Sequence, residues 1–282
     1  MATSRWRLDL AYDGAAFAGF AVQPDRTTVV GDLRAAIARS LQLDDEPFLV
    51  GAGRTDAGVH AFAQVVSFDL PEGVLEALGV ERFTRSLNAQ LRGSVVVTRV
   101  LAVPSDFSAR HDALWREYRY LVAPAPSFAS LDAISWAVPG ELDLAAMNEA
   151  AAAICGEHDF RAFCKRPVDK GPDEPLVRNV FEACWRLEPD AIHLSIAGGT
   201  FYVFSIRAKA FCHNMVRRLV SSLVAVGQGS LTREDVLERL DSHSGVGLPA
   251  PAPAGGLALV AVGYEDAVGG PAGSLALRHP DP

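Results

Sequence analysis

The hydrophobic pattern of this 282-residue chain changes its period several times, and this alternation limits the folds that the chain can adopt. From Arg5 to Tyr12, apolar and polar residues alternate, which predicts a strand, and Asp13-Gly14 then predicts a turn. The apolar residues within 28–43 recur at the spacing of a helix. Strands and helices that follow one another in this way predict a fold of the α+β class.

The same succession continues to residue 264 and divides the chain into two rounds. We expect further strands at 64–68, 94–103, 116–122, 180–187, 191–196, 204–209 and 257–264, and further helices at 81–91, 142–155 and 212–226. No residue-level repeat relates the two rounds. We predict an N-terminal α+β half over 1–112, a C-terminal α+β half over 113–266 and a flexible tail over 267–282.

The composition is that of a globular protein without a membrane span. Apolar residues make up 49% of the chain and charged residues 21%. The longest apolar stretch, from Phe211 to Gly227, contains charged side chains and falls short of the ~20 apolar residues that a bilayer-spanning helix needs. The N-terminal residues are polar and lack the apolar core of a signal peptide. We therefore expect a cytoplasmic protein.

The net charge of −8 hides an uneven distribution of charge. Between Arg82 and Arg119 the chain has seven arginines against three acidic residues. Between Phe201 and Ser230 it has four basic residues and no acidic one. A local basic surface can therefore coexist with an acidic protein, and a polyanionic partner is compatible with the sequence.

The cysteines and histidines show no pattern typical of a metal site. Cys155, Cys164, Cys184 and Cys212 match no Cys-x-x-Cys spacing, and we expect reduced, mostly buried thiols. The seven histidines never fall within five residues of one another. We therefore predict no metal site.

The stretch GAGRTDAGVH, from Gly51 to His60, is the most informative part of the sequence. It begins like the dinucleotide-binding fingerprint Gly-x-Gly-x-x-Gly, but Asp56 stands where that motif needs its third glycine. This argues against an enzyme with a nucleotide cofactor. The glycines favour a tight turn beneath a ligand, and they flank a cation, a hydroxyl and a carboxylate. From these residues alone, both an active-site loop and an ordinary turn in which Asp56 caps backbone amides remain open.

Residues 53–61, GRTDAGVHA, resemble the hallmark of the tRNA pseudouridine synthase A family, whose members isomerise uridines in the anticodon stem-loop. Further segments resemble other motifs of this family: Tyr12–Gly14, Ser86–Asn88, Phe107–Arg110, Arg116–Tyr120, Gly156–Phe160, Phe211–Arg217 and Ala250–Ala254. The resemblance covers about residues 5 to 264. Phe20-Ala21 departs from it, because the family usually has Trp-Gln there.

The resemblance implies the pseudouridine synthase fold, in which two ferredoxin-like α+β halves form a continuous antiparallel sheet with a central catalytic cleft. It also implies tRNA as the partner and a homodimer. The reaction breaks the N1–C1′ bond of uridine, rotates the uracil and joins C5 to the same sugar carbon. Because the oxidation state does not change and no atoms are imported, we expect no cofactor.

The resemblance also assigns roles to residues. It makes Asp56 the catalytic carboxylate, and whether Asp56 attacks the sugar, attacks the base or removes a sugar proton stays open. The uridine has to be flipped out of its stack to reach this residue. Tyr118 corresponds to the tyrosine that contacts the substrate, Arg54 to an arginine that fills the vacated stack or holds phosphate, and Arg217 to the arginine that pairs with the carboxylate. Four further residues are candidates for contacts with the tRNA backbone: Arg110, Arg116, Lys209 and Arg218.

A non-catalytic RNA-binding protein is the main alternative to an enzyme. Such a protein would need the basic segments but not Asp56, Tyr118 and Arg217 together. The joint presence of these three residues favours the enzyme. Tyr120, two residues after Tyr118 on the same predicted strand, is expected in the core.

Overall fold

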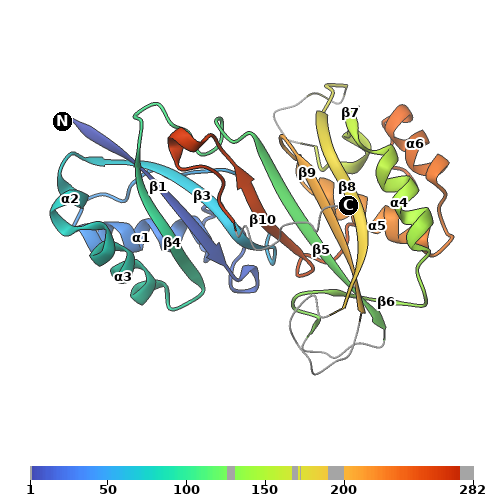
Figure 1. Cartoon of the computed structure of the whole chain (residues 1–282), viewed down its shortest axis with the longest axis horizontal. Helices are drawn as coiled ribbons and strands as arrows, with labels where there is room; N and C mark the ends of the chain where they lie inside the picture. Colours follow the sequence, from blue (N-terminus) through green and yellow to red (C-terminus); the bar gives the residue numbers. More distant parts are fainter. Residues whose placement is uncertain (1, 126–130, 167–170, 172, 190–199, 274–282) are drawn as a thin grey trace. The chain divides into compact units, whose positions relative to one another are not determined.

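The computed structural model describes residues 2–125, 131–166, 171, 173–189 and 200–273. The chain is of the predicted α+β class, with a large and mostly antiparallel sheet. It divides into two compact units (Figure 1): Met1–Arg116 with Leu259–Pro282, and Glu117–Ala258. The segment after Leu259 thus belongs with the first unit, whereas the sequence places residues up to 266 in the second half.

The first unit has the chain order β-α-β-β-α-β of a ferredoxin-like half. Its strands lie in the order β4-β1-β3-β10, and β2 pairs with β3. The elements are β1 (Thr3–Tyr12), η1 (Gly14–Ala16), α1 (Val29–Leu41), β2 (Val50–Gly51), β3 (His60–Pro71), α2 (Val74–Leu78), α3 (Val80–Leu91), β4 (Val95–Val103), β10 (Leu257–Gly263) and η4 (Asp266–Val268).

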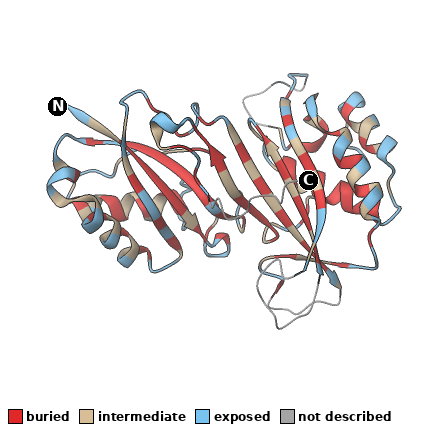
Figure 2. Cartoon of the chain, in the orientation of Figure 1, coloured by how far each residue is buried: buried red, intermediate tan, exposed pale blue. Residues whose placement is uncertain are grey.

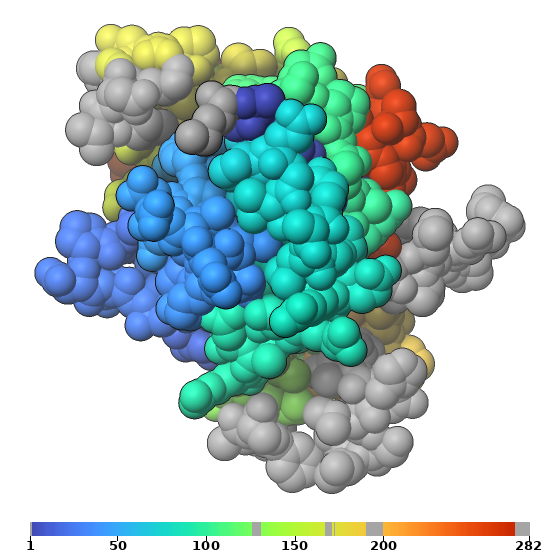
Figure 3. Space-filling view, turned by 90° about the vertical axis from the view of Figure 1, so that its left-hand side faces the viewer, coloured from blue at the N-terminus to red at the C-terminus, as the bar shows by residue number. Residues whose placement is uncertain are grey.

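Helices α1 and α3 cover one side of this unit. Thr28 caps α1 by accepting a hydrogen bond from the amide of Gly31, and Leu33 and Ile37 on the same helix are fully buried. Figure 3 shows α1 in blue beside α3 in blue-green. Between the two helices, the hydroxyl groups of Ser40 and Ser86 lie 2.8 Å apart. This side of the unit therefore combines an apolar core with a polar seam between helices.

The second unit contains strands in the order β5-β9-β8-β7, and β6 pairs with β5 in parallel. Buried residues line its strands and the helix faces that meet them (Figure 2). The elements are β5 (Trp115–Ala125), β6 (Trp136–Pro139), α4 (Leu144–Ala153), β7 (Gly156–Asp159), η3 (Arg161–Phe163), β8 (Val177–Pro189), β9 (Thr200–Ala208), α5 (Met215–Gly227) and α6 (Arg233–Ser242).

Helix α6 was not predicted from the sequence. Only Val236 and Leu240 of this helix are buried, so its apolar period is weak. Its start is fixed instead by a capping box, in which Thr232 and Asp235 satisfy each other's backbone amides. The predicted strand at 191–196 lies outside the described residues.

The segment from 267 to 273 differs from the flexible tail that the sequence predicts. Ala272 is buried, and it exchanges backbone hydrogen bonds of 2.9 and 3.1 Å with Val262. The carbonyl oxygens of Val268 and Gly270 accept hydrogen bonds from Arg7. These long-range contacts hold residues 268–272 to the first unit, and local composition gives no sign of them. Residues 274–282 lie outside the described part of the chain.

The expectation of reduced cysteines is wrong for two of the four. Cys164 and Cys212 form a disulfide with their Cα atoms 5.8 Å apart. The two segments already meet through the backbone, because the amide of Lys165 donates to the carbonyl of His213 over 2.8 Å. Cys155 and Cys184 are free, half-buried thiols, and burial raises the pKa of both.

Within the described residues, no helix is long and apolar enough to cross a membrane.

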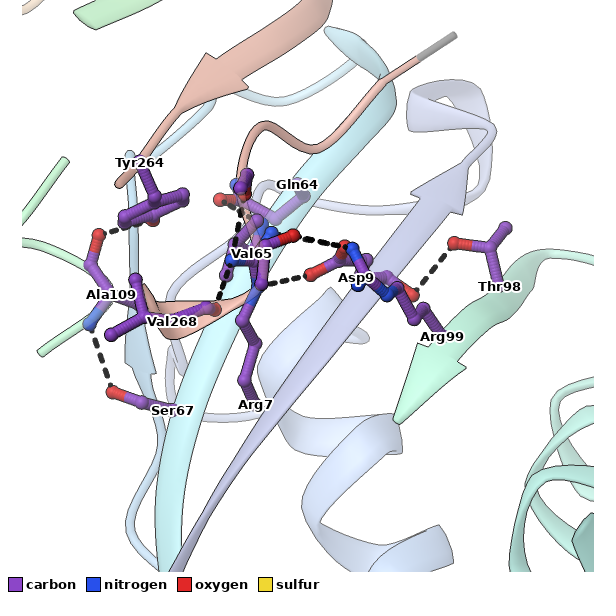
Figure 4. Close-up of polar contacts among 12 residues, drawn as sticks. Arg7, Asp9, Gln64, Val65, Ser67, Thr98, Arg99, Ala109, Tyr264 and Val268 are labelled. Carbon is purple, nitrogen blue, oxygen red and sulfur yellow. Dashed lines mark hydrogen bonds and ion pairs between the residues drawn. The ribbon is translucent and has the colours of Figure 1, made fainter. Parts of the chain in front are cut away.

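A buried ion pair holds the sheet of the first unit to the returning end of the chain (Figure 4). Arg7, fully buried on β1, donates hydrogen bonds of 2.6 and 3.1 Å to the carboxylate of Asp9. Its guanidinium carbon also lies 4.6 Å from the ring centroid of Tyr264. The same guanidinium donates to carbonyls in the segment that follows Tyr264. The guanidinium of Arg7 thus has partners near both ends of the chain: Asp9 on β1 and the carbonyls of Val268 and Gly270.

We expect Asp9→Asn to lower the free energy of unfolding by about 3–5 kcal/mol, because it leaves the Arg7 charge buried without its anionic partner. Arg5→Met is the matched control on the same strand. It breaks the half-exposed Arg5–Asp69 pair and the hydrogen bond from Arg5 to the carbonyl of Phe107, for which a combined loss of at most about 2 kcal/mol is expected. Urea unfolding of both variants measures the difference, and equal losses would contradict the structural importance of Arg7.

Candidate active site

The GRTDAGVH stretch forms an irregular loop over residues 52–59, between β2 and β3. Its backbone cannot use a strand partner along most of its length, so its polar groups need other partners. Only its first residue continues the sheet pattern, since the amide of Ala52 donates to the carbonyl of Val65 over 2.8 Å. Most of the remaining contacts come from buried side chains of the first unit, and the backbone amide of Phe20 adds one more.

Gln64 on β3 holds the loop at Gly53. The side chain is fully buried, and its Nε2 donates to the carbonyl of Gly53 over 3.0 Å. Its Oε1 accepts from the amide of the same residue over 3.4 Å. Gln64 therefore pairs with both backbone groups of Gly53, as a neighbouring strand would do.

A second chain of hydrogen bonds reaches the loop at Thr55. The hydroxyl oxygens of Tyr12 and Thr55 lie 2.7 Å apart, and both residues are buried. Burial raises the pKa of Tyr12 to about 12, so its hydroxyl keeps its proton at neutral pH. This contact fixes the residue immediately before Asp56.

Arg116 supports the base of the loop. Its guanidinium donates to the carbonyl of Ala52 over 2.8 and 3.1 Å, and to the carbonyls of Arg110 and Ala113 over 2.6 and 3.1 Å. The residue is only 7% exposed. The guanidinium is therefore enclosed by backbone carbonyls and supports the loop, and its contact with the tRNA backbone stays a prediction.

The segment that follows β1 packs against the other side of the loop. The amide of Phe20 donates to the carbonyl of Thr55 over 3.1 Å, and the ring of Phe20 stacks on Tyr12 with 6.3 Å between centroids. Nδ1 of His60 lies 3.2 Å from the amide nitrogen of Gly14 and 3.2 Å from Oδ1 of Asp13. Phe20 thus supplies an aromatic ring where the family usually has tryptophan.

Asp56 itself lies at a tight turn and is half-buried. Its carbonyl accepts a hydrogen bond from the amide of Val59 over 3.1 Å, and Gly58 inside the turn has a φ of +79°, which favours glycine. Arg54, two residues earlier, is exposed. The side chains of Gln64, Tyr12 and Arg116, with the backbone amide of Phe20, form a frame around the loop. This frame holds residues 52, 53 and 55, whereas the side chain of Arg54 stays exposed to solvent.

Tyr118 and Arg217 belong to the second unit. Tyr118 on β5 is 7% exposed, and its ring meets Phe211 edge-on with 5.1 Å between centroids. Tyr120 is fully buried, as expected for a core residue, and its hydroxyl donates to the carbonyl of Pro253 over 2.8 Å. The β5 strand therefore places both rings among buried groups.

Arg217 lies in the first turn of α5 and is half-buried. Its Nε donates to the carbonyl of Ala252 over 2.6 Å, and its own carbonyl accepts from the amide of Ala252 over 3.0 Å. Nη1 also lies 3.4 Å from Oδ1 of Asn214. Arg217 thus ties α5 to the Ala/Pro segment 250–254 of the same unit.

The other predicted RNA contacts differ in exposure. Arg110 and Lys209 are exposed, and Arg218 is half-buried. The Nε atom of Arg218 is buried without a hydrogen-bond partner among the described residues. In the same part of the chain, no group of three or more His, Cys, Asp or Glu side chains could hold a metal ion.

Sequence reasoning missed the residues that hold the loop. Gln64 and Tyr12 have roles that depend on partners 11 and 43 positions away. The only signal in the sequence is their polarity within predicted apolar strands, where a buried polar group requires a partner.

Comparison with known proteins gives consistent results. A family model described as tRNA pseudouridine synthase matches residues 150–265. The tRNA pseudouridine synthase A of Cutibacterium acnes is 41% identical over 263 residues, which cover 93% of this chain and 89% of that protein. Those of Frankia casuarinae and Leifsonia xyli are 41% and 38% identical and cover 92% and 93% of this chain, and 89% and 92% of their own lengths. The chain belongs to the tRNA pseudouridine synthase A family.

We expect Gly14→Ala to lower the free energy of unfolding by about 1–3 kcal/mol, because the new Cβ would overlap the carbonyl group of Val59 at the end of the loop. Gly171→Ala is the control, since a Cβ there meets no atom within 4 Å. That variant should be neutral or slightly stabilising. Urea unfolding measures both, and a neutral Gly14→Ala would contradict the close packing described above.

Proposed function

We propose that this chain isomerises uridine to pseudouridine in the anticodon stem-loop of tRNA, with Asp56 as the essential carboxylate. The observation that carries this proposal is the buried frame around residues 52–55, which fixes the backbone leading to Asp56. A turn that only capped backbone amides would not need support from Gln64, Tyr12 and Arg116. Membership of the family supports the same assignment.

The chemistry requires few groups. The N1–C1′ bond of uridine breaks, the uracil turns, and a C5–C1′ bond forms, while C5 loses a proton and N1 gains one. An ionised carboxylate at the reacting centre can act by covalent or electrostatic catalysis. The detached base has to be retained until it has turned, so a ring that packs on the uracil is needed as well.

Tyr118 is proposed to hold the flipped base, and Arg54 to fill the vacated stack or bind a phosphate. Flipping costs a few kcal/mol, and stacking on an aromatic ring returns about 1–3 kcal/mol per base. Arg217 is proposed to pair with the carboxylate of Asp56, as the resemblance implies. Within the second unit its guanidinium is held by contacts to Ala252 and Asn214.

The proposal includes a cytoplasmic homodimer that binds tRNA through local basic surface. Exposed Arg54, Arg110 and Lys209 are proposed phosphate contacts, together with half-buried Arg218. Such contacts dominate affinity for RNA without requiring a basic protein overall.

The direct test is to incubate the purified protein with tRNA, with no added cofactor, and to map pseudouridine by carbodiimide-dependent stops of reverse transcription. Wild-type protein should produce new pseudouridine in the anticodon stem-loop. Asp56→Asn should lower the single-turnover rate by at least about 1,000-fold while tRNA affinity stays nearly unchanged, because phosphate contacts are kept.

Asp45→Asn is the matched control, since Asp45 is an exposed acid in a loop of the same unit. It should retain the wild-type rate. Residual activity of Asp56→Asn above a tenth of wild type would end its assignment as the essential carboxylate. If tRNA binds but is never modified by the wild-type protein, the non-catalytic RNA-binding alternative is correct.

Tyr118 can be tested by two substitutions. Tyr118→Phe keeps the ring, the packing on Phe211 and the stacking surface, so its rate should fall by less than about tenfold. Tyr118→Leu removes the ring and should lose about 1–3 kcal/mol of base capture. Single-turnover rates at saturating tRNA compare the variants, and equal effects would indicate a core role.

A further inference from the structure

We propose that Gln64 is a positioning residue for Asp56, acting through the backbone of the site loop with Tyr12 as its relay to Thr55. This inference rests on the proposed function and adds residues that do not touch the reacting atoms. It concerns only the first unit, in which Gln64, Tyr12 and the loop all lie.

The side-chain amide of Gln64 forms a hydrogen bond at each of its donors and acceptors. Its two N–H donors serve the carbonyl of Gly53 at 3.0 Å and the hydroxyl oxygen of Tyr12 at 3.4 Å. Its oxygen accepts from the amides of Gly53 at 3.4 Å and Val65 at 3.2 Å. A side-chain amide has two donors and two acceptor sites, so all four hydrogen-bonding sites of Gln64 are occupied. Glu has the same length but supplies a single donor, and only when it is protonated.

Hydrogen bonds through Tyr12 carry this constraint to the residue next to Asp56. The Tyr12 oxygen accepts from Gln64 over 3.4 Å and lies 2.7 Å from the hydroxyl oxygen of Thr55, where either hydroxyl can donate. The carbonyl of Thr55 is held in turn by the amide of Phe20. Gly53 and Thr55 are therefore fixed three residues and one residue before the carboxylate. Catalysis is sensitive to such positioning, since a displacement of about 1 Å can cost 100-fold in rate.

Asn88 makes the same kind of contact with a residue outside the site loop, and we call such a contact a clamp: one side-chain amide pairs with the backbone amide and carbonyl of a single residue. Nδ2 of Asn88 donates to the carbonyl of Val97 over 3.0 Å, and Oδ1 of Asn88 accepts from the Val97 amide over 2.7 Å. Asn88 lies on α3 and Val97 on the strand β4. Loss of this clamp should affect stability alone, whereas loss of the Gln64 clamp should also affect the rate.

The experiment compares Gln64→Met with Asn88→Leu in the full chain. Both should lower the free energy of unfolding. Gln64→Met should also lower the single-turnover rate of pseudouridine formation at saturating tRNA by about 10- to 100-fold, with the Kd for tRNA within about twofold of wild type. Asn88→Leu should keep the rate within about twofold. Equal rates for the two folded variants would overturn the positioning role.

Two further variants decide the matter if Gln64→Met does not fold. Tyr12→Phe keeps the stacked ring and removes only the hydroxyl relay, so its rate should fall by about 3- to 10-fold at unchanged Kd. An unchanged rate would overturn the relay. Gln64→Glu has the same shape but, when ionised, lacks both donors. Its rate relative to that of the wild type at the same pH should rise as the pH falls, because the protonated acid regains one donor. A ratio of rates that stays constant with pH would overturn the proposal.

The outcomes separate this proposal from the function on which it rests. If the wild-type protein makes no pseudouridine, the proposed function fails, and the positioning role fails with it. If the wild-type protein is active, Asp56→Asn is inactive and Gln64→Met is fully active, only the positioning role fails.

Discussion

The first unit depends on how the buried carbonyl of Ala52 is satisfied. A backbone carbonyl that leaves the sheet and stays buried needs a donor, and a buried guanidinium needs acceptors. Arg116 and Ala52 solve both problems together, and the carbonyls of Arg110 and Ala113 complete the arrangement. Two parts of the chain that are distant in sequence, residue 52 and residues 110–116, therefore meet at one side chain. The loop that carries Asp56 begins at this point.

Side chains replace strand pairing in several places of this fold. Gln64 pairs with Gly53, Asn148 pairs in both directions with Trp185, and Arg217 does so with Ala252. In each case one polar side chain, or a side chain with its own backbone, meets the amide and the carbonyl of a single residue. Such clamps permit irregular backbone without unpaired buried groups. They explain how segments rich in glycine or proline keep a defined path.

The sequence predicted most elements of regular structure because their signals are local. Helix α1 was expected at 28–43 and spans Val29–Leu41, with the capping Thr28 visible in the sequence. The residues that hold the site were not predictable in this way. In the sequence Arg116 is one more cation in a basic segment, and nothing near it indicates its contact with the carbonyl of Ala52, 64 positions away. The pairing of Cys164 with Cys212, 48 positions apart, is hidden for the same reason.

The buried Arg7 has a consequence for how the protein is made. The carbonyl of Val268 that it requires is separated from it by 261 positions, and the ribosome adds roughly 5–20 residues per second. Arg7 therefore leaves the ribosome many seconds before its carbonyl acceptors at Val268 and Gly270 exist, and water has to take their place in the meantime. The first unit can be completed only after the second unit has been synthesised, because it includes the segment from Leu259 onward. A newly made chain consequently keeps the Arg7 side of β1 open to water until the segment up to Gly270 has been synthesised.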